Sequence, residues 1–115
     1  MQRGASRLAA FLAGALALVV SVDIAPNAAE FLLAMGDGEK NVRIENLFYR
    51  CVSGNYFAMV RNGKPEEEAG YDVVEAGELR VHVPRSMSFE DDIPRIVIFP
   101  RRTGRRDAGV SNAQN

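Results

Sequence analysis

The chain has 115 residues, of which 47% are hydrophobic and 25% are charged, and its formal net charge is -1. This composition supports one modest hydrophobic core, argues against two independent domains, and gives no overall attraction to nucleic acid or acidic membranes. Because Cys51 is the sole cysteine, no disulfide can form within the chain, which excludes a disulfide-stapled secreted scaffold.

The first twenty residues form an apolar N-terminal segment. Residues 8–20 read LAAFLAGALALVV and follow Arg3 and Arg7, which is typical of a signal-peptide core and short for a membrane span. The Ala-x-Ala pattern of a cleavage site is absent. The segment 1–20 is therefore interpreted as an extension of the domain, as a signal-like segment, or as a buried or interfacial helix. The predicted location is the cytoplasm, with export or membrane association as the alternative.

The domain proper is predicted at residues 21–100, and it is rich in strands. A short extended segment at 21–24 precedes a helix at 26–35, because Pro26 suits the first helical position and Gly36 supplies a stop. After Gly36 the apolar period changes to two, which predicts strands at 42–49, 55–60, 71–74, 79–83 and 96–99. The predicted fold class is mainly β with one or two helices (α+β).

The orientation of individual side chains follows from the alternation along these strands. Leu79, Val81 and Val83 are expected to point inward, and Arg80 and His82 outward, so His82 is interpreted as a surface histidine. In the polar connector 85–92, two apolar anchors are expected, Met87 and Phe89.

The last fifteen residues, 101–115, lack apolar periodicity and contain four arginines: Arg101, Arg102, Arg105 and Arg106. They are predicted to be a basic, disordered tail whose removal leaves the fold intact. Nucleic-acid binding is not expected, because the arginines are not interleaved with aromatic residues.

Several phrases in residues 21–99 resemble the HesB-like, A-type iron–sulfur cluster assembly carriers. Residues 22–30 (VDIAPNAAE) resemble the opening strand and helix of that family, and residues 51–56 (CVSGNY) lie where the family has Cys-x-Gly-x-x-Tyr. Residues 72–74 and 77–83 resemble its acidic loop and second hairpin. The resemblance implies a HesB-like β-sandwich.

The departures from the family pattern concern the ligands. Gly54 lies one position later than the family glycine, and Arg101 to Arg106 replace the Cys-x-Cys expected after Phe99. Cys51 is then the surviving ligand for metal or cofactor. An iron–sulfur cluster needs about four ligands, so any cluster would be weak and shared between subunits, or none would be bound.

The expected function is a divergent, noncatalytic iron–sulfur assembly or carrier protein with weak or lost cluster binding. Its expected partners are other iron–sulfur assembly or client proteins, and a second copy in a homodimer. The alternative is an exported or membrane-associated small β domain that acts as an interaction module. Cys51 itself has two interpretations. In the first, its sulfur is accessible and acts as a ligand or a reactive thiol, with the thiolate favoured by Arg50; in the second, it is a small buried hydrophobe. No enzyme is expected, because one cysteine and one histidine, His82, come without a motif for the remaining catalytic groups.

Overall fold

The computed structural model describes residues 19–114, so the interpretation of residues 1–18 lies outside the described part of the chain. Its elements are β1 (Asp23–Ile24), α2 (Pro26–Met35), β2 (Asn41–Arg50), β3 (Tyr56–Asn62), β4 (Tyr71–Ala76), β5 (Leu79–Pro84), β6 (Ser88–Phe89), the 3-10 helix η1 (Glu90–Asp92), β7 (Arg95–Pro100), β8 (Arg106–Val110) and β9 (Ala113–Gln114). The predicted mainly β class with a helix at 26–35 is confirmed.

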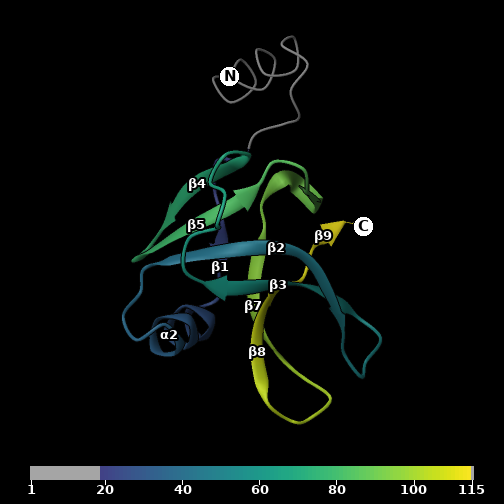
Figure 1. The fold of residues 1–115 in the computed structure, drawn as a ribbon. Coiled ribbons are helices and arrows are strands. Elements are labelled where there is room, and N and C mark those ends of the chain that lie inside the picture. Colours follow the sequence, from purple (N-terminus) through teal and green to yellow (C-terminus); the bar gives the residue numbers. More distant parts are fainter. Residues whose placement is uncertain (1–18, 115) are drawn as a thin grey trace.

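Seven strands form one sheet in the order β1-β7-β8-β3-β2-β5-β4, and β6 pairs with β9 in a separate two-stranded sheet. The pairs β1–β7 and β2–β5 are parallel, whereas β2–β3, β3–β8, β7–β8 and β4–β5 are antiparallel. In Figure 1 the sheet is strongly curled, so that β2 and β3 cross the direction of β7 and β8. Both ends of the sheet can therefore face the same core.

The core lies inside this curl and is closed by α2. Its buried side chains come from the helix, from strands β2 to β8 and from the loop before β6: Ala28, Leu32, Val42, Ile44, Ala58, Val60, Val74, Leu79, Val81, Val83, Met87, Phe89, Ile96, Ala108 and Val110. The inward orientation of Leu79, Val81 and Val83 is confirmed, as are Met87 and Phe89 as buried anchors. Burial of this apolar surface is the main force that holds the curled sheet and helix together.

Helix α2 has a clear beginning and end. Pro26 begins it, because the missing N–H of proline costs nothing in the first turn. At the other end the Gly36 N–H donates to the Leu32 carbonyl at 3.0 Å, and the Asn62 amide donates to the same carbonyl at 2.8 Å. The helix is therefore fixed to β3 at its C-terminal end, which places its exposed face beside the β7–β8 hairpin.

The prediction of a disordered tail at 101–115 is wrong. Residues Arg106–Val110 form β8, which lies between β7 and β3 in the large sheet. Ala108 and Val110 are completely buried, and Gly109 lies close to the Phe99 ring. The apolar pattern of this strand is short and uses small residues, so it gives little signal in the sequence. Removing it would take out a central strand.

The interpretation of His82 as a surface histidine is also wrong. Only 2% of it is exposed, because the face of β5 opposite Val81 is covered as well. Its Nε2 lies 3.0 Å from the Asn41 Oδ1, and its Nδ1 is buried without a partner in the described chain. Burial lowers the pKa of His82 below 6.5, so the neutral imidazole is favoured.

Strand β2 carries an irregularity that separates its outer half from the core. Its pairing with β3 shifts between Ile44 and Phe48, with more residues on β2 than on β3. An irregularity of this kind bends a strand and increases its twist. The β2–β3 hairpin therefore extends beyond the core toward the β7–β8 hairpin, as the lower right of Figure 1 shows. Within residues 19–114, the helices lack the length and hydropathy needed to cross a membrane.

Candidate functional site

The turns that close the β2–β3 and β7–β8 hairpins have the same backbone geometry. In the first, the Cys51 N–H donates to the Asn55 carbonyl at 2.9 Å, and the Gly54 N–H donates to the Cys51 carbonyl at 2.9 Å. In the second, Arg101 N–H donates to the Arg105 carbonyl at 2.7 Å, and Gly104 N–H donates back to Arg101 at 2.8 Å. Each turn needs a residue with positive φ, which glycine supplies at +95° (Gly54) and +89° (Gly104).

Aromatic side chains join the two hairpins. The rings of Phe57 and Phe99 are stacked with centroids 4.3 Å apart, and the Tyr49 ring lies 5.6 Å from Phe99. The Arg102 N–H donates to the Tyr49 hydroxyl at 2.8 Å, and the Arg101 guanidinium lies 4.5 Å from the centre of the Tyr49 ring. These contacts hold both turns side by side, although they are about fifty residues apart in the chain.

Cys51 lies in a small core of its own beside these rings. It is 4% exposed and packs in one cluster with Met59 and Phe99, which is separate from the main core. Its Sγ lies 2.8 Å from the Ser53 Oγ. The hydrogen bond with Ser53 lowers the pKa of the Cys51 thiol, and burial opposes this shift. The thiolate is thus favoured by a serine hydroxyl within a turn that closes over the sulfur.

The structure distinguishes between the two interpretations of this cysteine. The sulfur is buried and not accessible at the surface. The group that lowers the pKa of the thiol is the Ser53 hydroxyl, whereas the Arg50 guanidinium lies 5.9 Å from the centre of the Tyr56 ring. His82 belongs to β5 and pairs with Asn41 in a different part of the sheet, so the structure does not bring the cysteine and histidine together. A buried thiol that completes a small core is the interpretation that this geometry favours.

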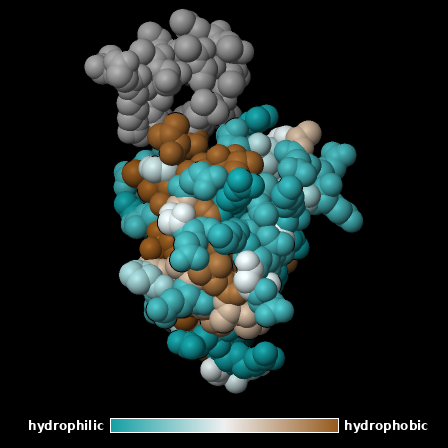
Figure 2. Space-filling model, turned by 90° about the vertical axis from the view of Figure 1, so that its left-hand side faces the viewer, coloured by the Kyte–Doolittle hydropathy of each residue, from teal (hydrophilic) through white to brown (hydrophobic). Residues whose placement is uncertain are grey.

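The two turns together form a strongly basic region, which we call the basic end: Arg50, Arg101, Arg102, Arg105 and Arg106. Arg101 pairs with Asp107 at 2.6 Å. Within the described residues the other four make no ion pair with a carboxylate. In the space-filling view the foot of the molecule, at the height of the β7–β8 turn, is mostly hydrophilic (Figure 2).

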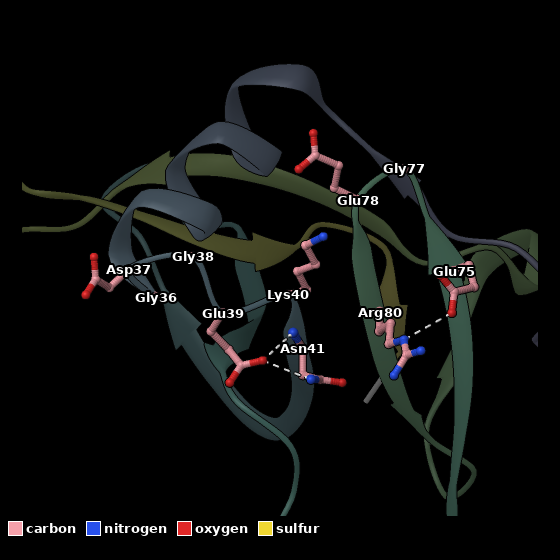
Figure 3. Close-up of a pocket in the computed structure, with 10 residues that line it drawn as sticks. All are labelled: Gly36, Asp37, Gly38, Glu39, Lys40, Asn41, Glu75, Gly77, Glu78 and Arg80. Carbon is pink, nitrogen blue, oxygen red and sulfur yellow. Dashed lines mark hydrogen bonds and ion pairs between the residues drawn. The ribbon is translucent and has the colours of Figure 1, made fainter.

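A cleft of about 890 Å³ lies between the end of α2 and the β4–β5 turn, where Figure 3 shows its charged side chains. The Glu39 carboxylate accepts two hydrogen bonds from Asn41, and Arg80 pairs with Glu75 at 3.2 Å. Asp37 and Glu78 point in different directions in Figure 3 and do not converge on one point. Among residues 19–114 no group of three or more His, Cys, Asp or Glu side chains could hold a metal ion. This cleft therefore offers no assembled set of ligands.

The sequence contains a signal for the paired turns. Ser53-Gly54 and Thr103-Gly104 both follow an aromatic strand end, and their hydroxyls lie 3.5 Å and 3.4 Å from the N–H groups of Asn55 and Arg105. Serine and threonine followed by glycine favour turns. Comparison of the two phrases would have predicted a second hairpin in place of a tail.

Comparison with known proteins corrects the family assignment. No curated protein and no solved structure gives a significant match to the chain. A family model does match residues 20–105, and it is described as the CC/Se motif containing family. The assignment to the HesB-like, A-type carriers is therefore wrong. The phrase CVSGNY, which suggested it, forms the turn between β2 and β3 in this structure.

The loss of this resemblance also removes the main support for a cluster at Cys51. Iron bound between two copies of Cys51 stays a prediction, which the iron and sulfide content after anaerobic reconstitution, with Cys51→Ser as control, would test. The description of the matching family refers to a CC/Se motif, whereas Cys51 is the sole cysteine of this chain and stands between Arg50 and Val52. Because the match extends over well more than half of the sequence, the chain belongs to the CC/Se motif containing family.

Proposed function

We propose that the protein is a noncatalytic binding module that docks onto an acidic surface of a partner protein through its basic end. The observation that carries this proposal is the group of four arginines without an ion pair among the described residues, on two turns that the Tyr49, Phe57 and Phe99 rings hold together. Because the ring contacts hold the backbone of both turns in place, a partner that binds there has to order only the arginine side chains, which favours fast and specific association.

The neighbourhood of the arginines supports a protein partner. Tyr56 and Val52 are 52% and 72% exposed on the β2–β3 hairpin, and Leu47 is 56% exposed on the same strand pair. Protein interfaces are enriched in arginine and tyrosine, with apolar groups at their centre. The net charge of -1 provides no positive potential over the whole molecule, which disfavours a nucleic acid as the ligand.

The test is the binding of a fluorescent, glutamate-rich peptide, followed by fluorescence anisotropy at low and at physiological salt. The double variant Arg50→Ala/Arg102→Ala should lose roughly tenfold in affinity, because each exposed charge pair contributes up to about 1 kcal/mol. The matched control is Arg80→Ala/Arg85→Ala, which removes the same charge from β5 and the loop after it.

An equal loss of affinity in both double variants would mean that total charge, and not the basic end, controls binding. Tighter binding of a DNA oligonucleotide of equal charge than of the peptide would contradict a protein partner. Far-ultraviolet circular dichroism should show unchanged folding in both variants, since Arg50, Arg80, Arg85 and Arg102 are all exposed.

A further inference from the structure

A separate cleft of about 360 Å³ lies between α2 and the β7–β8 hairpin. Its lining comes from the helix on one side and from the hairpin on the other: Phe31, Met35, Arg101, Thr103, Arg105, Arg106 and Asp107. Its volume falls within the range of small-molecule sites, about 300–1,000 Å³. The cleft shares Arg101, Arg105 and Arg106 with the basic end, whereas Arg50 and Arg102, the pair replaced in the docking test, do not line it.

The charge of the lining favours a doubly charged anion. Three arginines and one aspartate line the cleft, which gives a formal charge of +2. The aspartate is already engaged, because Asp107 accepts hydrogen bonds from Arg101 at 2.6 Å and from the Ala108 N–H at 2.8 Å. Arg105 and Arg106 make no ion pair within residues 19–114. Their guanidinium groups remain available to a ligand.

One of the arginines is held in place before any ligand arrives. Arg101 is fixed by Asp107 and by the Tyr49 ring, whose centre lies 4.5 Å from the guanidinium carbon. A fixed, planar guanidinium suits the oxygens of a phosphate, which it can bind with two parallel hydrogen bonds. Thr103 adds a hydroxyl that can donate to a phosphate oxygen.

The opposite wall of the cleft is apolar. Ala28 and Leu32 face the core, whereas Phe31 and Met35 lie on another face of α2, and Met35 is 61% exposed. An exposed methionine beside an aromatic ring offers an adaptable surface for an organic group. A ligand with both a phosphate and an apolar part can thus use both walls.

We propose that this cleft binds a phosphate monoester whose apolar part lies against Phe31 and Met35, while Arg101, Arg105 and Arg106 bind the phosphate. The ester is either a free small molecule or the phosphorylated side chain of a protein. Both sources present the same dianion beside an apolar group. No chemical step on the ligand is involved, since the cleft only binds it.

Isothermal titration calorimetry of the full chain with phenyl phosphate tests this site. Phenyl phosphate should bind roughly tenfold more tightly than inorganic phosphate, and phenol should show no measurable binding. The variant Arg105→Ala/Arg106→Ala should lose at least about tenfold in affinity, because two charge-assisted hydrogen-bonding groups are removed. The matched control Arg50→Ala/Arg102→Ala, which removes the same charge from the neighbouring turns, should bind within about twofold of the wild type.

A variant of the apolar wall tests the contact with the organic part of the ligand. Met35→Gln should weaken phenyl phosphate binding about threefold to tenfold and leave inorganic phosphate binding unchanged, since only the ester has an organic part. A phosphotyrosine peptide in a parallel titration distinguishes the sources: tighter binding than phenyl phosphate indicates a protein side chain, and weaker binding indicates a free ester. The proposal is overturned if wild type binds phenyl phosphate no better than phenol, or if Arg105→Ala/Arg106→Ala binds it as wild type does.

Discussion

Replacement of Val110 by alanine tests whether residues 106–110 are part of the fold. The Val110 side chain is completely buried in β8, where it lies opposite Ile96 of β7 and Ala58 of β3. Val110→Ala removes two methyl groups, each contributing about 0.8 kcal/mol of transfer free energy, and leaves a cavity between the strands. We therefore expect a loss of about 2–3 kcal/mol from the free energy of unfolding. Domains of this size have about 5–15 kcal/mol in total, so the effect is large.

The measurement is equilibrium unfolding in urea, followed by circular dichroism, with the slope of the transition compared between variants. Val73→Ala is the matched control, because it removes the same two methyl groups from a side chain that is 53% exposed on the edge strand β4. The control should change the free energy by less than about 0.5 kcal/mol. Equal, small effects of both substitutions would refute the packing of β8 in the core and restore a loose C-terminal tail.

Three further predictions concern single residues. Because burial lowers the pKa of His82 below 6.5, the unfolded state takes up a proton first as the pH falls. The contribution of the neutral His82 to the free energy of unfolding should be fully present above about pH 6.5 and should decrease below it. Urea unfolding of His82→Gln should lack this decrease, and the same pH profile in the variant and the wild type would contradict the prediction. Ser53→Ala should raise the pKa of the Cys51 thiol, whereas Ser53→Thr, which keeps a hydroxyl, should not. The pKa is measured from thiolate absorbance against pH, and equal pKa values in the two variants would show that the hydrogen bond is unimportant. Gly109→Ala should destabilise the fold by about 1–3 kcal/mol in urea unfolding, because the added Cβ would lie 2.8 Å from the Phe99 ring, and unchanged stability would show that the two strands can separate freely.

The elements with strong apolar periodicity could be predicted from the sequence. Helix α2 follows from Pro26, Gly36 and the spacing between them, and β5 from the alternation of Leu79, Val81 and Val83. His82 could not be placed, because alternation predicts only which side of a strand a residue faces. Whether a loop covers that side depends on the tertiary fold.

Strand β8 could not be predicted because it is short, its three buried residues Ala108, Gly109 and Val110 are small, and it begins with the charged Arg106 and Asp107, so the segment has the composition of a tail. Its place in the sheet depends on pairing with β3, about fifty residues earlier in the chain. The basic end could not be predicted for the same reason, because it also depends on contacts between distant segments. Arg50 and Arg102 become neighbours through the contacts of Tyr49, and no local pattern in either segment indicates this.

The most direct test of the proposed docking surface is an NMR titration of the isotope-labelled chain with the glutamate-rich peptide. Backbone amide shifts should change in residues 50–56 and 101–106, the two turns that carry the basic end, and at the same peptide concentration the changes should be much smaller in Arg50→Ala/Arg102→Ala. Shift changes centred on β4 and β5, with the two turns unaffected, would contradict the proposed function.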